Sequence, residues 1–245
     1  MSSPFPFSTS NSPAVIQHKR SQILEALIKA DPRFGAIPVR AVKYSTLQLM
    51  LQYYDAVFLG GILSQRYHSI KVTASSRLLS AAGKFIHPKT LTAYPDAEIR
   101  MSSDFLFRLK EGPFELNGLT VPTPQEAFLV VFEHELCHAV EFAYYGATGH
   151  SSRFMYFARG VFGHTKHTHE LPTIAAETTQ KTGISVGSHV SFPYEGQTLS
   201  GIVSYLGKSA RVMVPSPRGN YYLNNDHSRT YLKYQVPVSL LTRIP

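Results

Sequence analysis

Residues 134–138 have the sequence His-Glu-Leu-Cys-His, a combination that can bind and use a metal ion. On an α-helix, residues four apart lie on one face about one turn apart, so the imidazoles of His134 and His138 can bind one ion. Glu135 then lies beside the open coordination position, where it can accept a proton from a zinc-bound water whose pKa the metal has lowered to about 7. The pattern predicts one catalytic Zn²⁺ on His134 and His138, with Glu135 as general base. A pair of hydrogen-bonded core histidines is the alternative.

The flanking sequence predicts the helix that this geometry requires. Thr123, Pro124 and Glu126 have the residue types of an N-cap, a first-turn proline and a capping-box glutamate. No further glycine or proline occurs before Gly146, which predicts a helix of about 22 residues and about 33 Å. Upstream, Asn-Gly at 117–118 lies between apolar residues and predicts a tight hairpin.

A catalytic zinc usually has three protein ligands, so a third must come from elsewhere in the chain. A spacing of six residues after the second histidine leads to Tyr144, which does not suit this role. His150 is the best candidate, because the segment 146–149 can reverse the chain and bring the next helix, expected over 151–159, back to the metal. The other candidates are acidic or imidazole side chains further along the chain: Glu170, Glu177, His164, His167 and His169.

Packing helices and a small sheet are expected before the motif. Ser12 and Pro13 predict the start of a helix that ends near Asp31, and Ser45 is expected to cap a second helix that ends before Gly60. The segments whose alternating apolar residues predict a small antiparallel sheet are 69–73, 83–86 and 98–102.

After Gly183 the pattern changes to short alternating strands separated by turns, which predicts a small β-barrel. The expected fold class is therefore α+β, with helices, sheet and motif helix followed by the barrel. From the N-terminus we expect a disordered tail (1–12), a helical segment (13–40), the metal-binding domain (41–177), a linker (178–182) and the barrel (183–245).

The residues around the motif resemble those of the SprT-like metallopeptidases, the family that includes the Spartan proteases of eukaryotes. The similarity includes the motif at 134–138, the helix end at 144–146, and His150 with Phe154 four residues later. It continues upstream in Tyr54-Asp55, Phe58, Gly60–Leu63, Ala82-Gly83 and Glu98–Ser102. The similarity therefore covers about residues 45–170.

The resemblance implies a zincin-like minidomain with zinc on His134, His138 and His150, and with Glu135 as general base. It also implies a protein substrate held near DNA or crosslinked to it. Family members often have glycine after the third histidine, where this chain has Ser151, and many end in a cysteine-rich zinc ribbon. Here the expected barrel, which is similar to SH3-like or KOW-type modules, takes the place of that ribbon.

The composition of the chain limits the cellular locations that we expect for this protein. The longest apolar run, 127–132, is far shorter than the roughly 20 residues needed to cross a bilayer. A single cysteine cannot form an internal disulfide, and the N-terminus lacks the features of a secretory signal. We therefore expect a cytoplasmic protein that is neither secreted nor membrane-bound, and the sequence leaves its oligomeric state open.

The net charge of +8 is unevenly distributed. Basic residues exceed acidic ones by 5 over 60–110 and by 4 over 183–245, whereas acidic residues are in excess by 3 over 124–180. A basic surface favours a polyanionic partner such as DNA, single-stranded or bound without sequence specificity, and such a protein would be nucleoid-associated. Ordinary surface solvation is the alternative. The candidate nucleic-acid contacts are Arg211, Arg218, Arg229 and Lys233, beside Tyr221, Tyr222, Tyr231 and Tyr234. For these residues the sequence favours the other interpretation, barrel core and ordinary surface.

Several polar residues near the motif are candidates for supporting roles. Glu133 and Glu141 can hydrogen-bond the free N–H of a ligand imidazole, but for Glu141 the sequence favours a solvated surface position. Cys137 is expected to pack as a small buried residue. The three closely spaced histidines can bind a second metal, but they lack helical spacing, which favours a loop ordered against the cleft: His164, His167 and His169.

Together these features favour a zinc-dependent endopeptidase, in which an activated water attacks a peptide carbonyl and Glu135 acts as base and then proton donor. The alternative is a zinc-stabilised module that binds nucleic acid or protein without cutting it. The sequence does not identify the physiological substrate.

Overall fold

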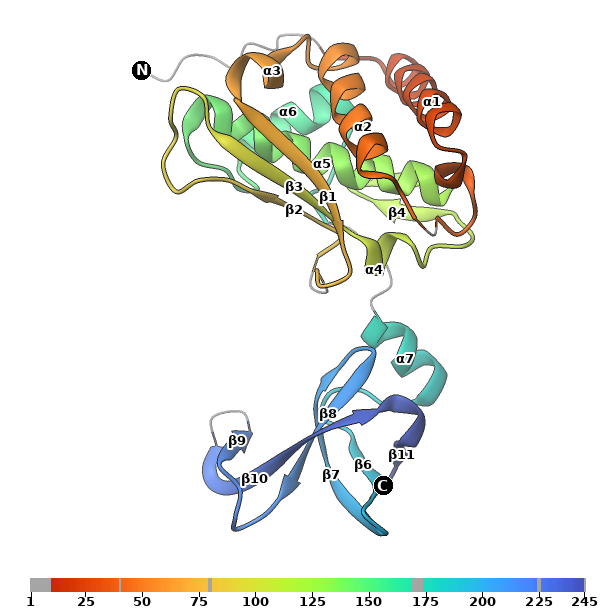
Figure 1. Ribbon diagram of the computed structural model, residues 1–245, viewed down its shortest axis with the longest axis vertical. Helices are drawn as coiled ribbons and strands as arrows, with labels where there is room; N and C mark the ends of the chain where they lie inside the picture. The colour runs from red at the N-terminus through yellow and green to blue at the C-terminus, as the bar shows by residue number, and fades with distance from the viewer. Residues whose placement is uncertain (1–9, 40, 79–80, 169–173, 224–225, 245) are drawn as a thin grey trace. The chain divides into compact units, whose positions relative to one another are not determined.

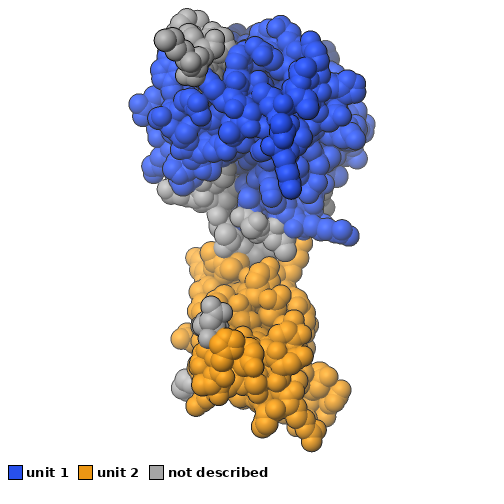
Figure 2. Space-filling model, turned by 90° about the vertical axis from the view of Figure 1, so that its left-hand side faces the viewer, with its two compact units in different colours: residues 1–171 blue, residues 172–245 orange. Residues whose placement is uncertain are grey.

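The computed structural model describes residues 10–39, 41–78, 81–168, 174–223 and 226–244, and these form a mixed α+β structure. The chain divides into two compact units, residues 1–171 and 172–245 (Figure 2), each with its own hydrophobic core. Within the described ranges, no helix is both long and apolar enough to cross a bilayer.

Three helices precede the sheet of the first unit, α1 (Pro13–Ala30), α2 (Tyr44–Val57) and α3 (Ile62–Arg66), with a 3₁₀ turn η1 at Pro32–Gly35 (Figure 1). Ser12 caps α1 as predicted. The expectation of a disordered tail is wrong for Asn11, which donates hydrogen bonds to the backbone carbonyls of 160–161. The rest of that expectation, residues 1–9, falls outside the described part of the chain.

The prediction that Ser45 caps α2 is also wrong. The helix begins at Tyr44, two residues earlier than a Ser45 cap would place it, and its N-cap Lys43 makes no side-chain capping bond. The carboxylate of Asp31 substitutes for a local cap, because it accepts hydrogen bonds from the Lys43 N–H and the Thr46 hydroxyl. Asp31 lies at the C-terminal end of α1, so no residue pattern near position 45 indicates this cap.

The sheet of the first unit contains β1 (Ser69–Ser75), β2 (Gly83–Ile86) and β3 (Asp96–Ser102) in the order β1-β3-β2. β3 pairs antiparallel with β2 but parallel with β1, so the expected antiparallel sheet is in fact mixed. After the short helix α4 (Ser103–Leu106), strands β4 (Phe114–Leu116) and β5 (Leu119–Val121) form the predicted hairpin. Its turn residues Asn117 and Gly118 have φ of 53° and 74°, as a tight turn of this kind requires.

Helix α5 (Pro124–Tyr145) carries the motif and has the predicted 22 residues, from the Thr123 cap to Gly146 in the left-handed conformation. Eighteen of its residues are buried, as expected for a helix that is apolar on most sides. It packs against β2 and β3 on one side and against α1, α3 and α6 (Ser152–Phe162) on others. The motif therefore lies on the central element of this unit.

The second unit is a helix and a six-stranded antiparallel sheet with the strand order β11-β6-β7-β8-β10-β9. Its final strand β11 pairs with its first strand β6, and its core includes Val190, Val203, Val212 and Val236. The elements of this unit are α7 (Ile174–Thr182), β6 (His189–Tyr194), β7 (Gln197–Leu206), β8 (Ser209–Pro215), β9 (Tyr221–Leu223), β10 (Asp226–Pro237), a 3₁₀ turn η2 (Val238–Leu240) and β11 (Thr242–Arg243).

The segment 178–182, expected as a linker, is the C-terminal half of α7, and the boundary between the units falls at 171–172. Thr179 explains part of this difference, because its hydroxyl hydrogen-bonds the carbonyl oxygens of Ala175 and Ile184. Ala175 also packs against the core of the second unit. The helix is thus part of that unit.

A buried ion pair joins α5 to α1. Arg20 donates two hydrogen bonds to the Glu133 carboxylate, at 2.7 and 2.6 Å, and the two side chains are 6% and 0% exposed. The Tyr54 hydroxyl on α2 donates to the same carboxylate, and His164 Nε2 lies 2.9 Å from it. Burial raises the pKa of Glu133, but the charge of Arg20 and the hydrogen bonds from His164 and Arg20 outweigh burial and hold the pKa below its ordinary value.

Replacing Arg20 by Met is expected to lower the free energy of unfolding by about 3–5 kcal/mol, because the Glu133 carboxylate then stays buried without its ion-pair partner. Urea denaturation at neutral pH measures the change. Arg100→Met is the control, since Arg100 also donates two hydrogen bonds to a carboxylate, that of Glu98, but these two side chains are 40% and 24% exposed, so the free energy of unfolding should change little. Equal losses in the two variants would contradict a special role for the buried pair.

Candidate metal centre

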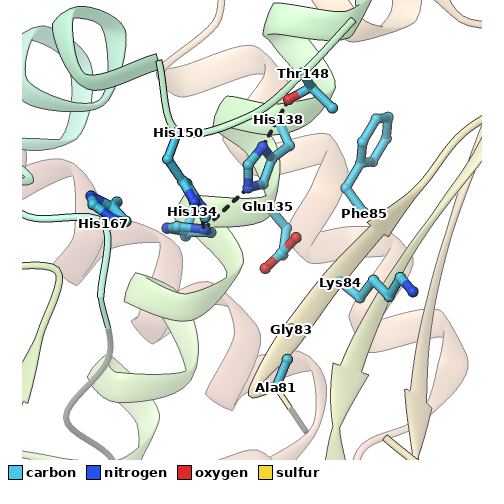
Figure 3. A pocket seen from close by; sticks show the side chains of 10 residues that line it. All are labelled: Ala81, Gly83, Lys84, Phe85, His134, Glu135, His138, Thr148, His150 and His167. Atoms are coloured by element: carbon cyan, nitrogen blue, oxygen red, sulfur yellow. Dashed lines mark hydrogen bonds between the residues drawn. The ribbon is translucent and has the colours of Figure 1, made fainter. Parts of the chain in front are cut away.

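Three histidines converge on one point of the first unit (Figure 3). His134 and His138 project from successive turns of α5, and His150 comes from the loop that leads into α6. The Nε2 atom of His134 lies 3.2 Å from that of His138 and 3.1 Å from that of His150. All three ligand atoms lie within 4.8 Å of one another. The structure thus brings together the three residues that the sequence nominated.

The donor set and its spacing fit a zinc ion. Zinc–nitrogen bonds of about 2.0–2.1 Å in tetrahedral geometry place the nitrogens about 3.3 Å apart, close to the separations found here. Imidazole nitrogen is also a ligand that suits zinc. No single hydrogen-bond pattern satisfies three nitrogens that all face one point, because each neutral ring has only one N–H. A cation at this point would use all three lone pairs.

Electrostatics keeps two of these rings neutral. Burial lowers the pKa of His138 to about 4, with further contributions from His150 and His87. Burial and the neighbouring His167 lower the pKa of His150, although the Glu141 carboxylate acts in the opposite direction. Neutral imidazole is the form that binds metals, so both rings are ready to act as ligands at neutral pH.

Glu141 holds the loop that delivers His150. Its carboxylate is 1% exposed and accepts hydrogen bonds from the Thr148 hydroxyl, the Gly149 N–H and the Ser151 hydroxyl. The expectation of a solvated surface position for Glu141 is therefore wrong. Glu141 contacts a ligand ring only indirectly, through the Thr148 hydroxyl, and no motif in the sequence singles out Thr148.

The Thr148 hydroxyl also fixes the tautomer of His138. It lies 2.8 Å from His138 Nδ1 and donates its own hydrogen to Glu141, so it accepts the hydrogen of Nδ1. The lone pair of His138 is then on Nε2, which points at the other two histidines. Partners of this kind orient metal ligands in many proteins.

Glu135 projects from α5 toward β2, beside the three histidines (Figure 3). Its side chain lies so close to Gly83 that a Cβ there would be 2.7 Å from Oε1, so any larger residue at position 83 would displace the Glu135 side chain. The Phe85 N–H donates a hydrogen bond to the carboxylate. Burial raises the pKa of Glu135 to about 8, and the hydrogen bond from Phe85 opposes this only in part.

A pocket of about 300 Å³ joins these groups. Residues of the 81–85 segment form one wall, and Thr148, His150 and His167 form the other. The His167 ring stacks on that of His150, with centroids 4.6 Å apart and planes at 25°. The Asn117 carbonyl holds the His167 loop in place by accepting hydrogen bonds from the N–H groups of residues 165–166.

Other residues named from the sequence have different places. Glu133 contacts Arg20, Tyr54 and His164 rather than a ligand ring, and His164 is fully buried in that network rather than in the cleft, so both expectations are wrong. No local pattern pairs Arg20 with Glu133, although the position of Arg20 between Ile16 and Ile23 indicates the buried side of α1. Cys137 is buried and free, as expected.

Two candidate ligands, Glu170 and His169, lie outside the residues that the structure describes, and Glu177 is on α7 in the second unit. Across the described ranges, the trio of His134, His138 and His150 is the one cluster close enough to hold a metal, so His164 and His167 do not form a second site there.

The residues proposed for nucleic-acid contact lie on or between β8, β9 and β10. Arg211, Arg218, Arg229 and Lys233 are all exposed. Their expected aromatic companions divide into two groups. Tyr221 and Tyr222 are exposed, whereas Tyr231 is buried and Tyr234 packs against Phe192 and Tyr194.

Comparison with known proteins adds no relative. The sequence matches no protein-family model, and no curated protein matches it. The function is therefore inferred from the geometry of the three histidines, Glu135 and the pocket.

Replacing His150 by Ala is expected to weaken zinc binding by more than about 100-fold, since the loss of even a hydrogen-bond partner of a metal ligand costs about 10- to 100-fold. Competition with a chromophoric chelator measures the affinity, and metal analysis gives the stoichiometry. His167→Ala is the control, because it removes the neighbouring ring but no ligand, and it should retain about one zinc ion per chain. Zinc affinity equal to wild type in His150→Ala would refute the assignment of the third ligand.

Proposed function

We propose that this chain is a zinc-dependent endopeptidase of the SprT-like type, with zinc on His134, His138 and His150. The observation that carries the proposal is the buried Glu135 carboxylate in the same open pocket as three converging imidazoles. The proposal includes a zincin-like minidomain in the first unit and an SH3-like barrel in the second. The pairing of β11 with β6 supports the barrel, because it joins the last strand to the first.

The chemistry follows from the groups that line the pocket. A zinc ion held by the three histidines supplies Lewis acidity, which lowers the pKa of a water molecule to about 7 and polarises a carbonyl. Glu135 accepts a proton from the attacking water and returns it to the leaving amine. Burial raises the pKa of Glu135, and the positive charge of a zinc ion beside it would lower that pKa, which favours the ionised form that a general base needs.

Strand β2 offers a place for the substrate backbone. It is an edge strand in the order β1-β3-β2, and three of its residues, 83–85, line the pocket. An extended peptide can add to such an edge through main-chain hydrogen bonds, which are largely independent of side-chain sequence. This arrangement would hold a scissile carbonyl between β2 and the histidines. We propose protein substrates at or near DNA, in line with the family resemblance and the net charge of +8.

The alternative is a zinc-stabilised binding module without catalysis. Structural zinc sites are usually closed by four protein ligands, whereas catalytic sites have three and an open position. Three histidines beside a pocket and a carboxylate with a raised pKa favour the catalytic class.

Glu135→Gln is expected to retain zinc and to lower the rate of peptide-bond cleavage by about 100-fold or more, because the amide cannot accept the proton. Cleavage of an unfolded protein substrate, with and without single-stranded DNA, measures the rate, and metal analysis checks the zinc content. Wild-type cleavage by this variant would rule out the role of Glu135. Zinc-loaded wild type without cleavage under any of these conditions would favour the binding module.

Gly83→Ala tests the positioning of Glu135. The added Cβ would lie 2.7 Å from Oε1 and 2.8 Å from Cγ of Glu135, so the carboxylate must move. A displacement of about 1 Å can cost about 100-fold, so we expect a fall in kcat of about 10- to 100-fold with zinc retained.

Gly149→Ala is the matched control for this substitution. It adds the same methyl group on the loop before His150, where a Cβ meets nothing within 4 Å. Activity close to wild type in Gly149→Ala, with loss in Gly83→Ala, is the expected pair of results. Equal activity in both variants would show that the contact with Gly83 does not position the general base.

A further inference from the structure

The sheet of the second unit has one face that does not contribute to the core. Residues directly opposite each other in an antiparallel pair point to the same face. Val203 and Val212 are such a pair and belong to the core. Tyr205 and Arg211, the next pair, therefore point to the opposite side, here called the outer face. By the same register, the outer face of β7, β8, β10 and β9 carries Ile202, Tyr205, Arg211, Met213, Lys233 and Tyr221.

Two exposed tyrosines on this outer face each lie beside a cation on the neighbouring strand. Lys233 Nζ lies 4.0 Å from the centroid of the Tyr221 ring, and Arg211 Cζ lies 5.5 Å from that of Tyr205. The two tyrosines are 38% and 37% exposed. Met213, opposite both Ile202 and Lys233, gives the centre of the face an apolar floor. Each ring thus has a positive charge next to it.

We propose that the outer face binds single-stranded nucleic acid, with bases stacked on Tyr205 and Tyr221 and phosphates at Arg211 and Lys233. Flat aromatic groups beside cations are the usual means of binding single strands without sequence preference. The four strands span about 14 Å from β7 to β9, at about 4.8 Å per interval, which accommodates more than one nucleotide. The net charge of +4 over 183–245 complements a polyanion.

Two other polyanions fit this face less well. An acidic peptide would engage Arg211 and Lys233 but leave the rings of Tyr205 and Tyr221 without a stacking partner. Duplex nucleic acid hides its base faces, so it would use the same two cations alone. The proposal is independent of the zinc site and stands or falls separately from the endopeptidase.

The test measures the binding of a fluorescent 20-nucleotide oligothymidylate to the full chain by fluorescence anisotropy. Tyr221→Ala should weaken binding by about 10-fold, within the range expected for the loss of one stacked base, and Tyr221→Phe should bind as wild type does. Lys233→Ala should weaken binding and reduce the slope of log affinity against log salt by about 0.7, as expected for one phosphate contact on a single strand.

Lys181→Ala is the matched control for charge. It removes one positive charge from α7, which packs against the core side of the sheet through Ala175. Affinity should stay at the wild-type level. Unlabelled competitors complete the test, and oligothymidylate should compete far better than a duplex of equal length or polyglutamate.

The proposal fails if wild type does not bind the oligothymidylate, or if Tyr221→Ala and Lys233→Ala both bind as wild type does. Equal competition by polyglutamate would also overturn it, because the face would then be a cationic surface for acidic peptides. Equal competition by the duplex would show that stacking on Tyr205 and Tyr221 contributes nothing.

Discussion

The buried carboxylate of Glu133 constrains the whole first unit, because an ionised group in the core must have partners within reach. Its partners come from α1, α2 and the segment after α6, through Arg20, Tyr54 and His164. These bonds fix how α5 is rotated about its axis. Successive residues of a helix differ by about 100°, so the direction of Glu133 also sets those of His134 and Glu135. The metal site and the general base are therefore oriented by an interaction that lies outside the pocket.

A second buried carboxylate, Glu141, has a comparable effect on the loop between α5 and α6. Helix α5 ends at Gly146, whose φ of 66° ends the helical path and reverses the direction of the chain. Glu141 then accepts three hydrogen bonds from residues 148–151. The loop conformation that gives the Glu141 carboxylate its hydrogen-bond donors therefore also places His150 beside His134. The same loop supplies the hydroxyl of Thr148 that orients His138.

The parts of this structure that the sequence predicts are those set by short-range rules. Helix α5 follows from its cap and its uninterrupted run, the hairpin follows from Asn117-Gly118, and His134 and His138 follow from their spacing of four. His150 can also be predicted as a ligand, because only a short turn between two glycines separates it from the helix.

The remaining features depend on contacts between distant segments. Arg20 and Glu133 are 113 residues apart, and nothing in either local pattern requires their pairing. Alternating apolar residues define which face of a strand is buried, but not its neighbours or its direction, so the parallel pairing of β1 with β3 was missed. The close approach of Gly83 to Glu135 is likewise a product of packing.

Three acidic residues on one helix show how surroundings, rather than residue type, assign chemical roles. Glu133 has an ion-pair partner and a lowered pKa, and Glu141 accepts three hydrogen bonds. Glu135 is equally buried but has one backbone donor, and its pKa rises to about 8. A carboxylate exchanges protons near neutral pH only when burial is not offset by such partners. Glu135 meets that condition, and it is the one that lies in the pocket with the three histidines.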